Sequence, residues 1–157
     1  MSPDISSAGR PGSVLHQSHR RCVVCGSDHP FGLRLDFTPC DDGSVEAVVD
    51  CEPLFQGYPG MVHGGIVSML LDGAMTNCLF AHGHPGVTGE LNVRFGHPVG
   101  TGRSVLVRAW IHESPPPFFV LKSELVQDER ICARATGKFV GHPGLPVDEG
   151  EDHGAFP

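Results

Sequence analysis

The sequence contains no apolar run of about 18 residues, the length that a membrane-spanning helix needs. Basic residues are also few: 11 against 18 acidic residues give a formal net charge of −7. Nucleic acids and anionic membranes attract the opposite sign, so neither is an expected partner, whereas an anionic small ligand needs only a locally basic site. The first residues lack the apolar segment of a signal peptide, and we therefore expect a cytoplasmic protein.

The remaining composition predicts one globular domain between two polar ends. A chain of 157 residues with 39% hydrophobic residues can bury one core, and no internal repeat marks a second domain. Residues 1–20 are polar, with glycine, proline and serine early, and residues 142–157 are punctuated by proline and acidic side chains. We expect both ends to be disordered, as an N-terminal arm and an acidic tail. The folded domain then covers residues 21–141.

Hydrophobic periodicity predicts two strands, one long helix and four further strands, in that order. The expected elements are strands at 31–38 and 44–51, a helix at 64–81, and strands at 87–95, 104–113, 118–127 and 131–140. Short links between the last four strands favour antiparallel hairpins. The helix is apolar on nearly every side, and such a helix is buried. An α+β fold, with one antiparallel sheet wrapped around a long central helix, satisfies both requirements.

One polar stripe interrupts this apolar helix. Ser68, Asp72 and Thr76 are spaced four residues apart and therefore share a face. Asp72 is the only charged residue between positions 64 and 81, and a carboxylate in an apolar setting is costly unless it is paired, solvated or functional. The stripe is either the exposed edge of the helix or the wall of a substrate cleft. In a cleft, Asp72 could act as a general base or as a nucleophile.

The helix begins at two glycines, Gly64 and Gly65, which form a tight turn or let a ligand approach the backbone. The first N–H groups of a helix have no partner within it and could hold the oxyanion of a thioester under attack. Gly65 and Asp72 are two turns apart, roughly 10 Å along the axis. One chain can hardly supply both groups to one carbonyl, so we expect two equivalent sites at a two-fold interface, one helix start and one Asp72 coming from different subunits.

Several stretches resemble a known family. The segment from His63 to Asp72, His-Gly-Gly-Ile-Val-Ser-Met-Leu-Leu-Asp, resembles the His-Gly-Gly…Asp signature of hotdog-fold acyl-CoA thioesterases of the phenylacetic-acid-degradation type. Residues 55–65, 90–95 and 22–33 resemble further stretches of that superfamily, and the similarity covers roughly residues 22–140. The resemblance implies the hotdog fold and hydrolysis of an acyl-CoA thioester to CoA and a carboxylic acid.

The resemblance also implies roles for particular residues. The family's catalytic carboxylate falls on Asp72 and its oxyanion glycine on Gly64, with Gly65 beside it. His63 would help to position the thioester. Thr88 takes the place of the family's hydroxyl residue on the strand after the helix, where it would orient the attacking water or Asp72.

Further residues are expected to contact substrate. Some relatives carry an asparagine six residues before the histidine; here that position is Gly57, with Gln56 beside it as a possible substitute. Substrate-binding candidates are Gln56, Ser68, Thr76 and Asn92. We expect acyl-CoA as the partner molecule, a homodimer or homotetramer with active sites at the dimer interface, and no cofactor or metal.

Two alternatives stay open. The pair Cys22-x-x-Cys25, with histidines nearby, is compatible with zinc, with a redox pair or with a structural turn, although no second such pair is present. For function, hydration or dehydration of acyl-CoA would require a different acid and histidine motif, which is not found. A non-catalytic acyl-CoA binding or sensor protein is the remaining alternative, and such a protein has no need of Asp72.

Overall fold

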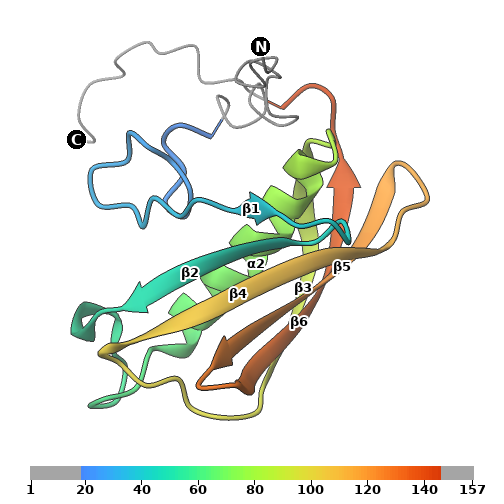
Figure 1. Cartoon of the computed structure of the whole chain (residues 1–157). Helices are drawn as coiled ribbons and strands as arrows, with labels where there is room; N and C mark the ends of the chain where they lie inside the picture. The colour runs from blue at the N-terminus through green and yellow to red at the C-terminus, as the bar shows by residue number, and fades with distance from the viewer. Residues whose placement is uncertain (1–18, 146–157) are drawn as a thin grey trace, which may run out of the picture.

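One long helix, α2 (Gly64–Ala81), lies against a curved antiparallel sheet in the computed structural model, which describes residues 19–145 (Figure 1). The strands are β1 (Thr38–Pro39), β2 (Val45–Cys51), β3 (Gly86–Phe95), β4 (Arg103–Glu113), β5 (Phe118–Gln127) and β6 (Arg130–Gly141), and a short 3-10 helix, η1 (Pro53–Phe55), precedes α2. The strand order is β1-β2-β4-β5-β6-β3. This confirms the predicted sheet around a central helix. The predicted arm and tail lie outside the described residues, except for residues 19–20 and 142–145.

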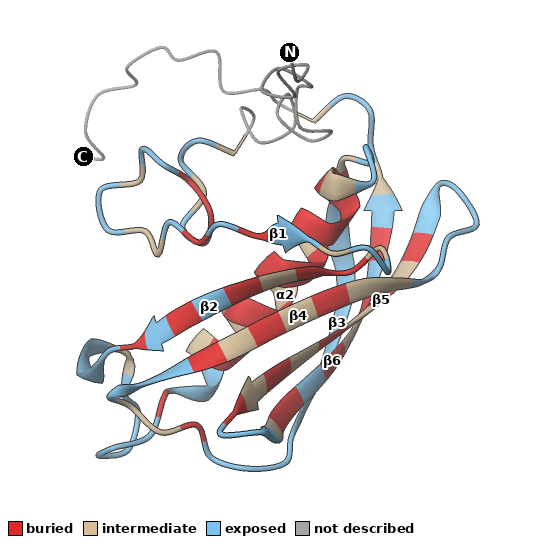
Figure 2. Ribbon diagram, viewed as in Figure 1, coloured by how far each residue is buried: buried red, intermediate tan, exposed pale blue. Residues whose placement is uncertain are grey.

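The helix is buried because it is apolar around most of its circumference. Leu71, Ala74, Met75, Cys78 and Leu79 have no exposed surface. By length and mean hydropathy, 1.3, α2 could also cross a membrane, but more than half of it is buried inside the sheet, as in the core helix of a globular domain (Figure 2). Its observed bounds are those that the sequence predicts.

The sheet supplies the other half of the core through alternating side chains. Inward positions of β2 are buried, Val45, Ala47, Val49 and Cys51 among them, as the predicted alternation requires. Gly137 of β6 lets the sheet approach the helix closely. A Cβ there would lie 2.6 Å from a ring carbon of Phe139, with Met75 of α2 at 3.0 Å.

The first predicted strand, residues 31–38, is wrong except at its end. Only Thr38 and Pro39 pair with β2. The N–H groups of Leu33 and Leu35 instead donate to backbone carbonyls in the turn at residues 22–25, at 2.8 and 2.9 Å. Arg34 between them has φ 51°, in the left-handed region, which is incompatible with an extended strand. Alternating hydrophobicity reports which side chains face the core and does not distinguish a strand from an irregular segment packed on the same core.

The predicted hairpins hold for β4–β5 and β5–β6 but not for β3–β4. Strand β3 pairs with β6, and β4 pairs with β2 and β5. The short link after β3 therefore crosses from one edge of the sheet to its middle. This leaves β3 as an edge strand with an exposed outer side (Figure 2).

Candidate functional site

The start of α2 presents one unpaired N–H group. His63 is the N-cap, and its Nδ1 accepts a hydrogen bond from the Gly65 N–H at 2.8 Å. The His63 carbonyl accepts from the N–H groups of Ile66 and Val67 at 2.9 and 3.1 Å. Within residues 19–145, the N–H of Gly64 has no acceptor. It lies at the positive end of the helix dipole and is thus ready to bind an oxygen atom of a ligand.

These bonds separate the roles of the three residues at the helix start. Gly65 was expected beside Gly64 as a donor to the thioester, yet its N–H is already bound by His63. The His63 ring was expected to position substrate, and the structure uses its Nδ1 as a helix cap, leaving Nε2 as the ring nitrogen available to a ligand. A Cβ at Gly65 would lie 3.0 Å from that Nδ1, so this cap also favours glycine.

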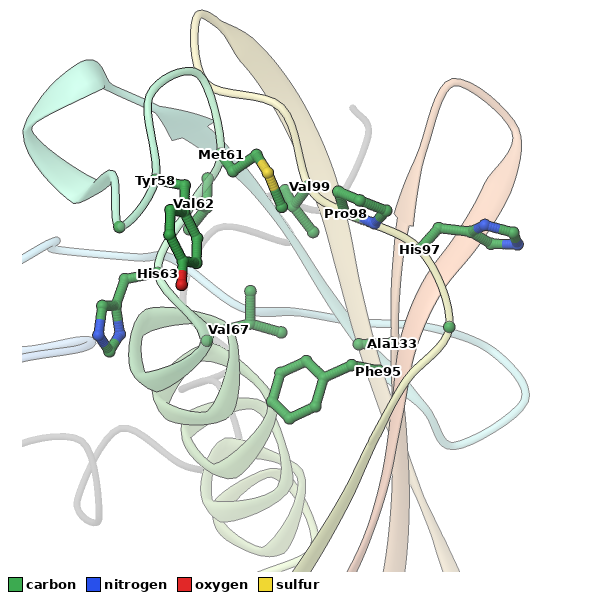
Figure 3. Close-up of a pocket in the computed structure, with 13 residues that line it drawn as sticks. Tyr58, Met61, Val62, His63, Val67, Phe95, His97, Pro98, Val99 and Ala133 are labelled. Carbon is green, nitrogen blue, oxygen red and sulfur yellow. The ribbon is translucent and has the colours of Figure 1, made fainter.

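A cavity of about 680 Å³ opens beside Gly64, which is one of its lining residues (Figure 3). Its volume lies in the range of small-molecule sites, roughly 300–1,000 Å³. Tyr58, Met61, Val67 and Phe95 give it a largely apolar wall; Tyr58 lies above the start of α2 and Phe95 beside the helix. None of these four was a predicted site residue, although all four lie within the stretches that resemble the family.

Asp72 lies two turns further along the helix and is half-buried. Its Oδ1 accepts a hydrogen bond from the Thr88 hydroxyl of β3 at 2.7 Å. The hydroxyls of Ser68 and Thr76 donate to backbone carbonyls of the helix itself, at Gly64 and Asp72 respectively. The polar stripe is therefore present as predicted, and Thr88 is the residue that holds its carboxylate.

Thr88 reaches the helix because β3 is irregular next to it. The pairing of β3 with β6 shifts between Thr88 and Glu90, which leaves Gly89 as an extra residue. Without this bulge, alternation would place Thr88 on the outer face with Glu90. With it, Thr88 pairs with Phe139, a buried residue, and points inward.

Two predicted substrate contacts are not brought to this carboxylate. Asn92 pairs with Thr136 on the same side as Glu90, the face of the sheet away from α2. Gln56 uses its Oε1 to accept the Gly60 N–H at 3.3 Å, which closes the loop before the helix. Neither residue lines the cavity beside Gly64.

Comparison with known proteins assigns the residues of this site to a protein family. Residues 59–135 match the family model of the thioesterase superfamily. This domain belongs to the thioesterase superfamily. The matched residues of the thioesterase-superfamily domain run from the loop before α2 into β6, and so include the Gly64 N–H, Asp72 and Thr88.

Relatives of the thioesterase-superfamily domain agree with this assignment. The acyl-coenzyme A thioesterase THEM4 of Bos taurus is 29% identical over 90 residues, which are 56% of this chain and 37% of that protein. The chain thus matches less than half of that relative's length. Among solved structures, a thioesterase superfamily protein superposes with a TM-score of 0.73 at 24% identity, covering 77% of this chain and 63% of the other.

Two other structures bear on the type of thioesterase and on ligands. A phenylacetic acid degradation-related protein of Ralstonia eutropha JMP134 has a TM-score of 0.63 and 26% identity, over 69% of this chain and 85% of the other. A protein of Streptococcus mutans UA159 solved with bound acetyl CoA has a TM-score of 0.64 at 18% identity, over 69% and 88%. The hotdog fold predicted from the resemblance is thereby confirmed.

Proposed function

We propose that the chain is an acyl-CoA thioesterase, which hydrolyses an acyl-CoA to CoA and a free carboxylic acid. The observation that carries the proposal is the unpaired Gly64 N–H beside an apolar cavity, in a thioesterase-superfamily domain. The thioesterase name of the bovine relative and the acetyl CoA bound to a structural neighbour support the same substrate class.

In the proposed reaction, the Gly64 N–H donates to the thioester carbonyl oxygen and holds the negative charge that develops there. Asp72 either takes a proton from a water molecule that attacks the carbonyl carbon or attacks that carbon itself. Collapse of the tetrahedral intermediate breaks the carbon–sulfur bond, and CoA leaves as a thiolate that gains a proton. When water attacks, this step releases the carboxylic acid; when Asp72 attacks, it leaves an acyl–Asp72 anhydride, which water then hydrolyses to the acid and the free carboxylate. Thr88 orients the Asp72 carboxylate throughout, through its hydrogen bond to Oδ1.

One chain cannot supply both the Gly64 N–H and the Asp72 carboxylate to the same thioester. Gly64 and Asp72 are eight residues apart on one helix, about 12 Å along its axis. An oxyanion donor and an attacking atom must each lie about 3 Å from one carbonyl group. Asp72 does not line the cavity beside Gly64. We therefore assign each complete site to two subunits.

Strand β3 is the proposed contact between those subunits. It is an exposed sheet edge, and such an edge can pair with another strand. Its Thr88 end lies at Asp72, whereas its Phe95 end lies at Gly64, where a Cβ would be 3.5 Å from the Phe95 ring. If two copies of β3 pair antiparallel about an axis at Asn92, the extra residue Gly89 brings Thr88 opposite the partner subunit's Phe95. That register brings Asp72 to the partner subunit's Gly64.

The apolar side chains of β3 support this contact. Leu91 and Phe95, on the helix-facing side of β3, are 36 and 55% exposed in the single chain, and Val87, on the other face, is 46% exposed. A gathering of exposed apolar side chains on one strand is typical of an interface. Pairing of two sheets at this edge would cover them and extend the sheet across the dimer.

The decisive experiment measures thiol release from short, medium, long and aryl acyl-CoAs by the wild-type chain and by Asp72→Asn. The substitution keeps the shape of the side chain and removes its charge, so we expect kcat to fall at least 100-fold, the usual contribution of a general base. Asp50→Asn is the matched control, because Asp50 also accepts a hydroxyl hydrogen bond at 2.7 Å, from Ser104, on the surface. The control should keep wild-type activity.

The outcomes separate the two candidate functions. Thiol release that depends on Asp72 supports the thioesterase, and the ranking of substrates gives the acyl class. Binding of acyl-CoA without thiol release by the wild-type chain would contradict the thioesterase and favour a sensor protein. Full activity in Asp72→Asn would refute the role given to this carboxylate.

A further inference from the structure

The segment before β1 packs on the helix with an unusual set of side chains. Val24 and Cys25 are 5 and 4% exposed, although they lie in a turn rather than in a strand or helix. Val24 occupies a notch at Gly73 of α2, where a Cβ would lie 2.6 Å from its Cγ1. The ring of His19 meets the ring of Phe80 edge-on, with centroids 4.5 Å apart. Gly73 lies roughly 100° around the helix from Asp72, so the turn packs on an adjoining face of α2 and not on the face that meets Thr88.

Three metal-ligating side chains converge in this turn. The ligand atoms of His19, Cys22 and Cys25 all lie within 4.8 Å of one another, and Cys25 Sγ is 3.9 Å from His19 Nδ1. A tetrahedral zinc ion, about 2.3 Å from sulfur and about 2.0 Å from nitrogen, separates its ligand atoms by roughly 3.6–3.8 Å. Contraction of the cluster by about 1 Å or less would therefore give zinc geometry. A redox pair needs only the two sulfurs and leaves the placement of the histidine unexplained.

Two backbone N–H groups of the turn donate hydrogen bonds to Cys22. The Val24 N–H donates to Cys22 Sγ at 3.4 Å, and the Gly26 N–H donates to the Cys22 carbonyl at 2.8 Å. A Cβ at Gly26 would lie 2.4 Å from the Arg20 carbonyl oxygen and 2.5 Å from the Cys22 nitrogen, so only glycine fits. A backbone N–H directed at sulfur stabilises a thiolate, the form in which cysteine binds metals.

The charges of the cluster suit a divalent cation. Two thiolates with a neutral imidazole would balance the charge of a divalent ion.

We propose that His19, Cys22 and Cys25 bind a zinc ion that stabilises the N-terminal turn packed on α2. Two sulfur ligands and one imidazole are a set that zinc favours, with a water molecule in the fourth position. The site lies on a different face of the helix from Thr88 and Asp72. It is independent of the thioesterase proposal and can be correct or wrong by itself.

The first test is the zinc content of the full chain, purified under reducing conditions without chelator and measured by mass spectrometry. We expect one zinc per chain, and loss of it in Cys22→Ser and in Cys25→Ser. Cys40→Ser is the matched control, since Cys40 is a half-buried free cysteine outside the cluster, with its Sγ on the Thr38 carbonyl. It should retain the metal.

A second measurement uses only the wild-type chain, so its result does not depend on whether the cysteine variants fold. After chelation, added Co²⁺ should give a thiolate-to-cobalt charge-transfer band. Amide exchange in residues 19–37 should be faster in the chelated chain than in the zinc-bound chain, with little change in β4 and β5. A metal-free chain without a cobalt band, equal zinc in Cys22→Ser and wild type, or a Cys22–Cys25 disulfide in the purified chain would each overturn the proposal.

Discussion

Replacing Gly64 with proline removes one N–H group and little else. Gly64 is the first residue of α2, where proline is well tolerated because its missing N–H would have no partner inside the helix. The preceding residue must be extended, and His63 already is, with φ −60° and ψ 136°. The hydrogen bonds that the N–H groups of Gly65 and Ile66 make to His63 remain possible. The substitution therefore isolates the proposed oxyanion donor.

The expected loss follows from what one such donor contributes. Removing a single oxyanion donor costs about 2.7–4 kcal/mol of transition-state stabilisation, or roughly 100- to 1,000-fold in kcat. Gly64→Ala is the control because it keeps the N–H, and its Cβ would meet the Phe95 ring at 3.5 Å, an ordinary contact. The assay is steady-state thiol release, accompanied by thermal unfolding of both variants. If Gly64→Pro stays within about threefold of Gly64→Ala, the Gly64 N–H is not the oxyanion donor.

Three further predictions follow from the same geometry. Mixing Gly64→Pro with Asp72→Asn subunits should restore about a quarter of wild-type activity. Half of the dimers are mixed, and one of the two sites in each mixed dimer combines an intact Gly64 N–H with an intact Asp72. No recovery of activity would place each site in one chain. Thr88→Val should lower kcat about 10- to 100-fold by removing a hydrogen bond to a carboxylate, whereas Thr76→Val, which loses only a bond to a helix carbonyl, should not. Gly137→Ala should destabilise the chain by about 1–3 kcal/mol in urea unfolding, because its methyl group would meet a buried ring at 2.6 Å; an unchanged midpoint would contradict that packing.

The central helix could be predicted in full because its signal is local. An apolar run with one polar stripe, begun by glycines and ended at His82, determines the bounds of α2 without knowledge of the rest of the chain. The same holds for the inward face of β2. The order of strands is not local, since β3 and β4 are neighbours in sequence but separate in the sheet. A short link there resembles a hairpin, and only the pairing of β3 with β6 excludes it.

The site was predictable in composition but not in arrangement. Sequence spacing placed Asp72 on a polar stripe and showed that Gly65 is far from it. The direction of Thr88 depends on the bulge at Gly89, and alternation across a bulge gives the wrong face. The capture of the Gly65 N–H by His63 depends on a side-chain rotamer, which no pattern of residue types reports.

Two incompletely covered features of residues 19–145, the polar stripe of α2 and the edge strand β3, lie side by side. Sheet strands bury most of α2 but leave the stripe with Asp72 half-exposed, and the strand that holds Asp72, through Thr88, is the open edge β3. A second copy paired at β3 would cover exposed side chains such as Leu91 and Phe95 and bring a new Gly64 N–H to each Asp72. Under the proposed arrangement, assembly and catalysis depend on the same strand. A monomer would then keep its core, which lies within one chain, and would still lack any complete site.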